Sequence, residues 1–153
     1  MSKKSGFTLA ETLMVVAITV MVAGLMMFSF SSYGSTEAIS KDQARVVSAL
    51  EKARAMTLDS YKSSQYGVHF GTSTVTIFSG VTYSAANSAN IVTNLNSKVK
   101  IKTVAVVGGG SDIIFNRLTG ETNQTGTTTL SLISSASTTR SVTVFATGLV
   151  QPN

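Results

Sequence analysis

Ser5-Gly6-Phe7-Thr8-Leu9-Ala10-Glu11 lies near the N-terminus, and the run from Thr12 to Phe30 that follows it carries no charged residue. As a helix, this run of about 19 residues spans about 29 Å, close to the thickness of the hydrocarbon core of a bilayer. The apolar segment of a secretory signal is shorter, about 7 to 15 residues. The sequence therefore predicts a transmembrane helix that is retained.

Charged residues around this segment predict its orientation. Lys3 and Lys4 precede it, and the next basic residue is Lys41. Because basic residues favour the cytoplasmic side of a membrane, we expect the N-terminus in the cytoplasm and the rest of the chain outside it.

Glu11 is the unusual residue of the segment. A carboxylate that enters hydrocarbon on a helix costs on the order of 3 kcal/mol, so it needs a partner or a functional reason. The sequence offers no neighbouring cation. Cleavage after Gly6 would, however, give Phe7 a free amine, which could pair with Glu11 in the same chain or in a neighbouring one.

These N-terminal residues resemble the leader of type IV pilins and type II secretion pseudopilins. The resemblance covers about the first 30 residues and implies that a prepilin peptidase cuts after Gly6 and methylates the Phe7 amine. It implies further that Glu11 meets the Phe7 amine of an adjacent subunit during filament growth. Other subunits and an inner-membrane assembly platform would be the partners. The alternative is an unprocessed single-pass anchor with a tolerated glutamate.

Composition limits the rest of the chain. The protein has 153 residues, no cysteine and a formal charge of +5. About 120 residues follow the apolar segment, enough for one domain with its own core. Without cysteine, disulfides, thiolate metal sites and cysteine nucleophiles are excluded.

Small residues recur at intervals of seven in the apolar segment, at Ala10, Ala17 and Gly24. Small residues on one helix face let a second helix approach closely in a lipid environment. The pattern suits the core of a filament and equally suits any bundle of membrane helices.

Helical periodicity resumes after the apolar segment. One apolar face is predicted from Ile39, Val46, Val47, Leu50, Ala53, Leu58 and Tyr61. Ion pairs three or four residues apart are expected for Glu37 with Lys41, Asp42 with Arg45, and Glu51 with Arg54. The simplest structure is one helix from about Phe7 to Lys62, apolar in its first half and amphipathic in its second.

The composition after Lys62 predicts strands. Residues 67–70 and 75–78 suit a hairpin, and residues 79–97 suit a loop or a weak edge element. Further strands are expected at 98–107, 112–118, 127–133 and 140–146, with a short terminal piece at 148–150. A long helix followed by five or six strands indicates an α+β fold, with an antiparallel sheet laid on the helix.

The second resemblance rests on Ala-Leu-Glu-Lys-Ala-Arg at residues 49–54, Tyr66-Gly67-Val68-His69-Phe70, Ile114-Phe115 before Gly120, and Val142-Thr143-Val144 before Gly148-Leu149-Val150. In these residues the chain resembles the minor pseudopilins of the GspH and FimT type. The resemblance implies a pilin-like fold with four parts: a cleaved leader (1–6), a transmembrane or filament-core helix (7–30), its amphipathic continuation (31–62) and a β-rich head (63–153).

Candidate catalytic chemistry is sparse. His69, the single histidine, is expected to be structural or exposed rather than a base or ligand. No histidine and acid cluster has metal-ligand spacing, and Gly108-Gly109-Gly110 lacks the lysine of a phosphate-binding loop. We expect no enzymatic activity, no metal and no cofactor.

A basic face is the one candidate binding site. Lys98, Lys100 and Lys102 alternate along a predicted strand and, with Arg117 or Arg140, could contact DNA phosphates. Lysines that protect a sheet edge are the alternative explanation. Three functions therefore compete: a minor pilin or pseudopilin, a major pilin or DNA-uptake pilin, and a monomeric anchored binding module.

Overall fold

The computed structural model describes Gly6 and residues 8–153, apart from the side chains of residues 27–32. Residues 1–5 of the predicted leader and Phe7 lie outside the described residues. The chain divides into two compact units, one ending at Thr36 and the other running from Glu37 to Asn153.

The first unit contains the apolar part of helix α1, which runs from Leu9 to Leu58. The 18 residues Leu9–Met26 have a mean hydropathy of 2.1, and none of them is buried. In the core helix of a soluble protein, apolar side chains such as Leu13, Met21 and Leu25 would be packed against other elements; here they are exposed. A helix long and apolar enough to span a membrane, near the N-terminus, is therefore confirmed.

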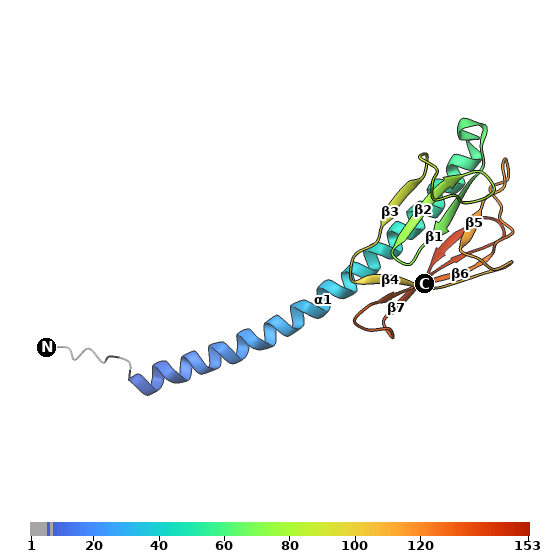
Figure 1. Ribbon diagram of the computed structural model, residues 1–153. Coiled ribbons are helices and arrows are strands. Elements are labelled where there is room, and N and C mark those ends of the chain that lie inside the picture. Colours follow the sequence, from blue (N-terminus) through green and yellow to red (C-terminus); the bar gives the residue numbers. More distant parts are fainter. Residues whose placement is uncertain (1–5, 7) are drawn as a thin grey trace. The chain divides into compact units, whose positions relative to one another are not determined.

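The second unit begins with the amphipathic part of α1, and its predicted apolar face is largely confirmed. Ile39, Val46, Leu50 and Ala53 are completely buried. Figure 1 shows the strands of the head gathered along this part of the helix.

The helix ends four residues earlier than predicted. Ser60 adopts a left-handed conformation with φ of 49°, which stops the helix, and a short 3₁₀ turn follows at Tyr61–Ser63. The buried Thr57 hydroxyl accepts the Tyr66 N–H at 2.9 Å and so ties the helix end to the first strand. Leu58 and Tyr61, both expected on the apolar face, are exposed.

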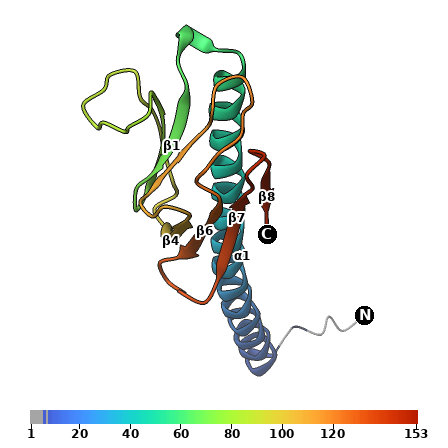
Figure 2. The ribbon, with the colours of Figure 1, turned by 90° about the vertical axis from the view of Figure 1, so that its right-hand side faces the viewer.

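In the described part of the chain, eight strands form two antiparallel sheets of four strands each. The first sheet has the order β3-β2-β1-β5 and the second β4-β6-β7-β8. The first contains β1 (Tyr66–Phe70), β2 (Thr74–Ser79), β3 (Ile91–Asn94) and β5 (Asp112–Ile114); the second contains β4 (Val99–Val106), β6 (Gly126–Leu132), β7 (Thr139–Val144) and β8 (Val150–Pro152). Figure 2 shows β7 and β8 beside the same part of α1.

The prediction of an α+β fold is confirmed, whereas the prediction of a single sheet is wrong. The β1 and β2 hairpin forms as expected, with Val68 opposite Ile77. The chain then leaves this sheet: β4 pairs with β6, and β5 returns to pair with β1. The consecutive strands β4 and β5 therefore lie in different sheets. The residue pattern within each strand does not reveal which strand it pairs with.

The core lies between α1 and the inner faces of both sheets. Its buried members come from the helix and from strands of each sheet, among them Leu50, Val68, Leu130 and Val142. Phe78, on the opposite face of β2, is also buried and lies over Gly67, where a Cβ atom would come within 2.7 Å of the Phe78 ring. Glycine is therefore required at this close approach.

Candidate functional site

Glu11 takes part in a capping box at the start of α1. Its Oε2 accepts hydrogen bonds from the Thr8 N–H and the Thr8 hydroxyl, both at 3.3 Å, and its own N–H donates to Thr8 Oγ1 at 3.3 Å. The reciprocal bonds satisfy backbone groups that the first turn of a helix leaves free. The Thr-x-x-Glu spacing was a visible signal for this box, which the sequence reasoning missed.

The predicted processing site lies just before this box. Gly6 is exposed and outside the helix, and a Cβ atom built on it would meet no atom within 4 Å. Phe7 lies outside the described residues, so its contact with Glu11 stays a prediction. The carboxylate of Glu11 is exposed and remains accessible to a cation.

Ala10, Ala17 and Gly24 are exposed on the apolar part of α1. No atom lies within 4 Å of a Cβ atom built on Gly24. In the described part of a single chain, nothing covers this face, so a helix from another subunit could pack on it. That packing stays a prediction.

The predicted basic face lies just before β4 and in its first half. A β-bulge lies between Ile101 and Thr103, and the Nζ of Lys102 donates to the Ala136 carbonyl at 3.2 Å. Lys98 and Lys100 precede the bulge; Lys98 is exposed and Lys100 is half-buried. Val99 and Ile101 are buried, so by alternation Lys98, Lys100 and Lys102 lie on the other face of the strand, and DNA contact there stays a prediction.

Arg140 does not join these lysines. It lies opposite Leu130, which lies opposite Ile101, and residues directly opposite in a ladder share a face. Lys100, one residue before Ile101, is on the other face of the sheet. Arg117 is exposed in the turn after β5. Of the two arginines predicted to join the lysines, Arg140 is therefore excluded by the register, and a patch with Arg117 stays a prediction.

His69 holds a loop against the first sheet. Its Nδ1 lies 2.6 Å from Asp112 Oδ1 on β5, and its ring stacks on Tyr83 with centroids 3.8 Å apart. Tyr83 also meets Phe78 edge-on at 5.6 Å. These contacts agree with the structural role predicted for His69. Among the described residues, no three His, Cys, Asp or Glu side chains come together as a metal site.

Asp42 is buried instead of lying in a surface ion pair. Its side chain is completely buried, accepting a hydrogen bond from Arg45 Nη1 at 2.8 Å and from the Asn96 N–H at 2.7 Å. The predicted pair with Arg45 is confirmed, and the bond to Asn96 links the helix to the segment between β3 and β4. The Glu37 and Lys41 pair is also confirmed, at 2.7 Å.

Asp42→Ala should lower the free energy of unfolding by about 2 to 4 kcal/mol, because it removes the only described partner of the Asn96 N–H inside the protein. Urea unfolding of the detergent-solubilised chain, followed by circular dichroism, measures the change. Glu37→Ala, which removes an exposed ion pair, is the control and should leave stability nearly unchanged. Equal losses in the two variants would contradict the buried role of Asp42.

Arg54 links the helix to two turns and does not pair with Glu51 as predicted. Its Nε donates to the Gly120 carbonyl at 3.1 Å, and its Nη2 donates to the Thr147 carbonyl at 3.2 Å. The two turns lie far away in sequence, so spacing along the helix could not reveal these acceptors.

No protein-family model, curated protein or solved structure matches this chain. What the chain does must therefore be argued from its own residues.

Proposed function

We propose that this protein is a non-enzymatic structural subunit, a minor pilin or pseudopilin, which is cleaved after Gly6 and assembles into a filament through its N-terminal helix. The supporting observation is the apolar helical segment Leu9–Met26, none of which is buried and whose first turn carries the capping box of Thr8 and Glu11. A pilin-like fold of helix and head is part of this proposal.

The exposed helix needs an apolar environment. Burying an apolar side chain such as Leu13 or Leu25 stabilises by about 1.5 to 3 kcal/mol relative to exposure in water. A bilayer supplies that environment before assembly, and helices of neighbouring subunits supply it within a filament. Ala10, Ala17 and Gly24 would let such helices approach closely.

Glu11 has two roles in this proposal. Its side chain caps the helix through Thr8, and its charge remains available for the Phe7 amine that cleavage after Gly6 would create. An amine buried in an apolar surrounding is costly without a carboxylate partner. Subunits would therefore be held in the position at which each Phe7 amine meets a Glu11 carboxylate. The bonds from Thr8 do not compensate the carboxylate charge.

Assembly of the proposed filament begins with the subunit in the inner membrane, its N-terminus in the cytoplasm and its head outside. The partners are a prepilin peptidase, other pilin or pseudopilin subunits, the assembly platform and membrane lipid. In this route residues 1–6 are removed, the first half of the helix enters the filament core, and the head of residues 63–153 lies on the filament surface.

Processing tests this proposal. Intact-mass spectrometry of the membrane-extracted protein should show loss of residues 1–6 and addition of one methyl group in cells that contain the peptidase. In cells that lack the peptidase, the same protein should start at or near Met1. An unprocessed N-terminus in both strains would overturn the proposal, and the variant Gly6→Leu is the matched control for cleavage at this bond.

A further inference from the structure

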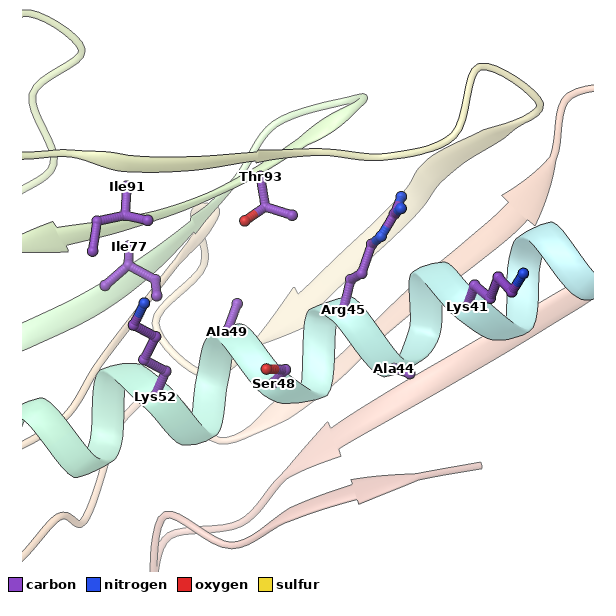
Figure 3. Close-up of a pocket in the computed structure, with 9 residues that line it drawn as sticks. All are labelled: Lys41, Ala44, Arg45, Ser48, Ala49, Lys52, Ile77, Ile91 and Thr93. Carbon is purple, nitrogen blue, oxygen red and sulfur yellow. The ribbon is translucent and has the colours of Figure 1, made fainter.

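A groove of about 380 Å³ lies between helix α1 and the first sheet. The helix contributes Lys41, Ala44, Arg45, Ser48, Ala49 and Lys52, and the sheet contributes Ile77, Ile91 and Thr93. Figure 3 shows Arg45, Ala49 and Lys52 directed from the helix toward strands β2 and β3, which carry Ile77, Ile91 and Thr93. All of them belong to the unit of residues 37–153.

Strand β3 forms one wall of the groove and is an edge strand. Among the described residues it pairs with β2 only. The Leu95 N–H donates to Ser73 on the β2 side, so by alternation the backbone groups of Val92 and Asn94 face the free edge. Consistent with this geometry, the Asn94 carbonyl accepts a long hydrogen bond of 3.5 Å from Arg45 Nη1.

The edge lacks the usual protection against pairing with another chain. Protected edges carry lysine, proline or a bulge, whereas β3 has the sequence Ile91-Val92-Thr93-Asn94 and a regular register. Val92 is 56 % exposed and Ile91 is 38 % exposed. The strand therefore presents the backbone groups of Val92 and β-branched side chains to whatever lies beside it, while Arg45 contacts the Asn94 carbonyl.

The charge of the groove is positive. None of its nine lining residues is acidic, and three are basic. Lys41 already pairs with Glu37, whose pKa it lowers by hydrogen bonding and by its charge, and Arg45 pairs with the buried Asp42. Lys52 has no ion-pair partner among the described residues, so an incoming carboxylate would meet an uncompensated ammonium.

The floor of the groove is shallow and mixed in character. Ala44, Ser48 and Ala49 are small, while Ile77 and Ile91 are apolar. A strand added beside β3 would lie over this part of the helix, with one row of side chains directed at the small residues. Because alternate residues of a strand point to opposite faces, acidic residues in the row toward the helix would meet its basic side chains, and apolar residues in the other row would lie beside Val92.

We propose that this groove binds an extended, acidic segment of a different polypeptide, which adds a strand to the free edge of β3 and places a carboxylate against Lys52. Main-chain hydrogen bonds to the edge provide affinity in such complexes, and side-chain pockets provide specificity. A second copy of this chain fits less well, because joining two β3 edges would bring two basic grooves together. The proposal does not depend on filament assembly.

Binding can be tested with the full chain in detergent micelles and a short fluorescent peptide in which glutamate and valine alternate. Fluorescence anisotropy should show saturable binding that weakens at least about tenfold for Lys52→Glu, because a rim attraction becomes a repulsion. Val92→Pro, which removes an edge N–H, should weaken binding similarly, whereas Val92→Ala, which keeps it, should bind within about threefold. Lys98→Glu, a charge change outside the groove, is the control for net charge.

Several outcomes would overturn the proposal. These are absence of saturable binding, equal binding by Lys52→Glu and Lys98→Glu, and equal binding of a peptide with lysine in place of glutamate. The edge would belong to a second copy if the chain self-associates and Val92→Pro abolishes that self-association.

The groove would belong to lipid if the chain binds anionic phospholipid vesicles in a way that depends on Lys52 but not on the Val92 N–H. Should Val92→Pro not fold, Lys52→Glu and the lysine peptide still decide the question. A negative result here leaves processing after Gly6 unaffected, so the two proposals fail separately.

Discussion

Gly148→Ala should lower the free energy of unfolding by about 3 to 5 kcal/mol, one of the largest effects expected of a single methyl group in this protein. Gly148 is buried in the turn between β7 and β8 and has φ of +75°, a left-handed conformation that costs an alanine about 1 kcal/mol. The added Cβ would also lie 1.9 Å from the Gly120 carbonyl oxygen and 2.7 Å from Arg54 Nε.

The clash involves backbone and therefore cannot be relieved by a side-chain rotation. Moving the turn away from Gly120 would separate Arg54 from the two carbonyls that it joins. Urea unfolding of the solubilised chain measures the loss. Thr147→Ala, in the same turn, removes an exposed side chain but keeps the carbonyl that Arg54 uses, and should change stability by less than about 0.5 kcal/mol. A loss below about 1 kcal/mol for Gly148→Ala would mean that the turn relocates without cost.

Glu11→Gln should reduce the fraction of protein assembled into filaments at least about tenfold, while membrane insertion is retained. Glutamine at this position of a capping box still accepts the hydrogen bonds of Thr8, so the start of the helix is preserved. The variant removes only the negative charge, which is the part of Glu11 that the proposed pairing with the Phe7 amine requires.

Thr8→Ala is the matched control for Glu11→Gln. It removes the hydroxyl of the capping box, at a cost of about 0.5 to 2 kcal/mol in helix stability, but leaves the carboxylate charged. Quantitative immunoblots of sheared filaments and of washed membranes compare the two variants. Normal assembly of Glu11→Gln together with defective assembly of Thr8→Ala would show that Glu11 acts as a cap and would contradict the charge-pair role.

Local periodicity predicted the helix better than the sheets. The spacing of Ile39, Val46, Leu50 and Ala53 indicated the buried face, since residues three and four apart lie on one side of a helix. The helix end was missed because it depends on the left-handed Ser60, which carries no glycine or proline signal. Each strand pattern indicated an approximate position but not a partner, so the division into two sheets could not be foreseen.

Long-range contacts account for the errors at individual side chains. Asp42 had the spacing of a surface ion pair, and its burial depends on the distant Asn96 N–H. Arg140 was offered as a neighbour of Lys98, Lys100 and Lys102, but its place on the other sheet face becomes visible only when the registers of β4, β6 and β7 are known. In contrast, the Thr8 and Glu11 box is local and was readable from the sequence.

The attachment of the helix to the head has a mechanical consequence. Asp42, Gln43 and Arg54 each bind backbone groups of the head: Asp42 at Asn96, Gln43 at Ser141 and Asn153, and Arg54 at Gly120 and Thr147. These anchors are spread over about 18 Å of helix. A pull on the helix is therefore shared among anchors loaded in parallel, and the head resists detachment more strongly than one anchor alone would allow.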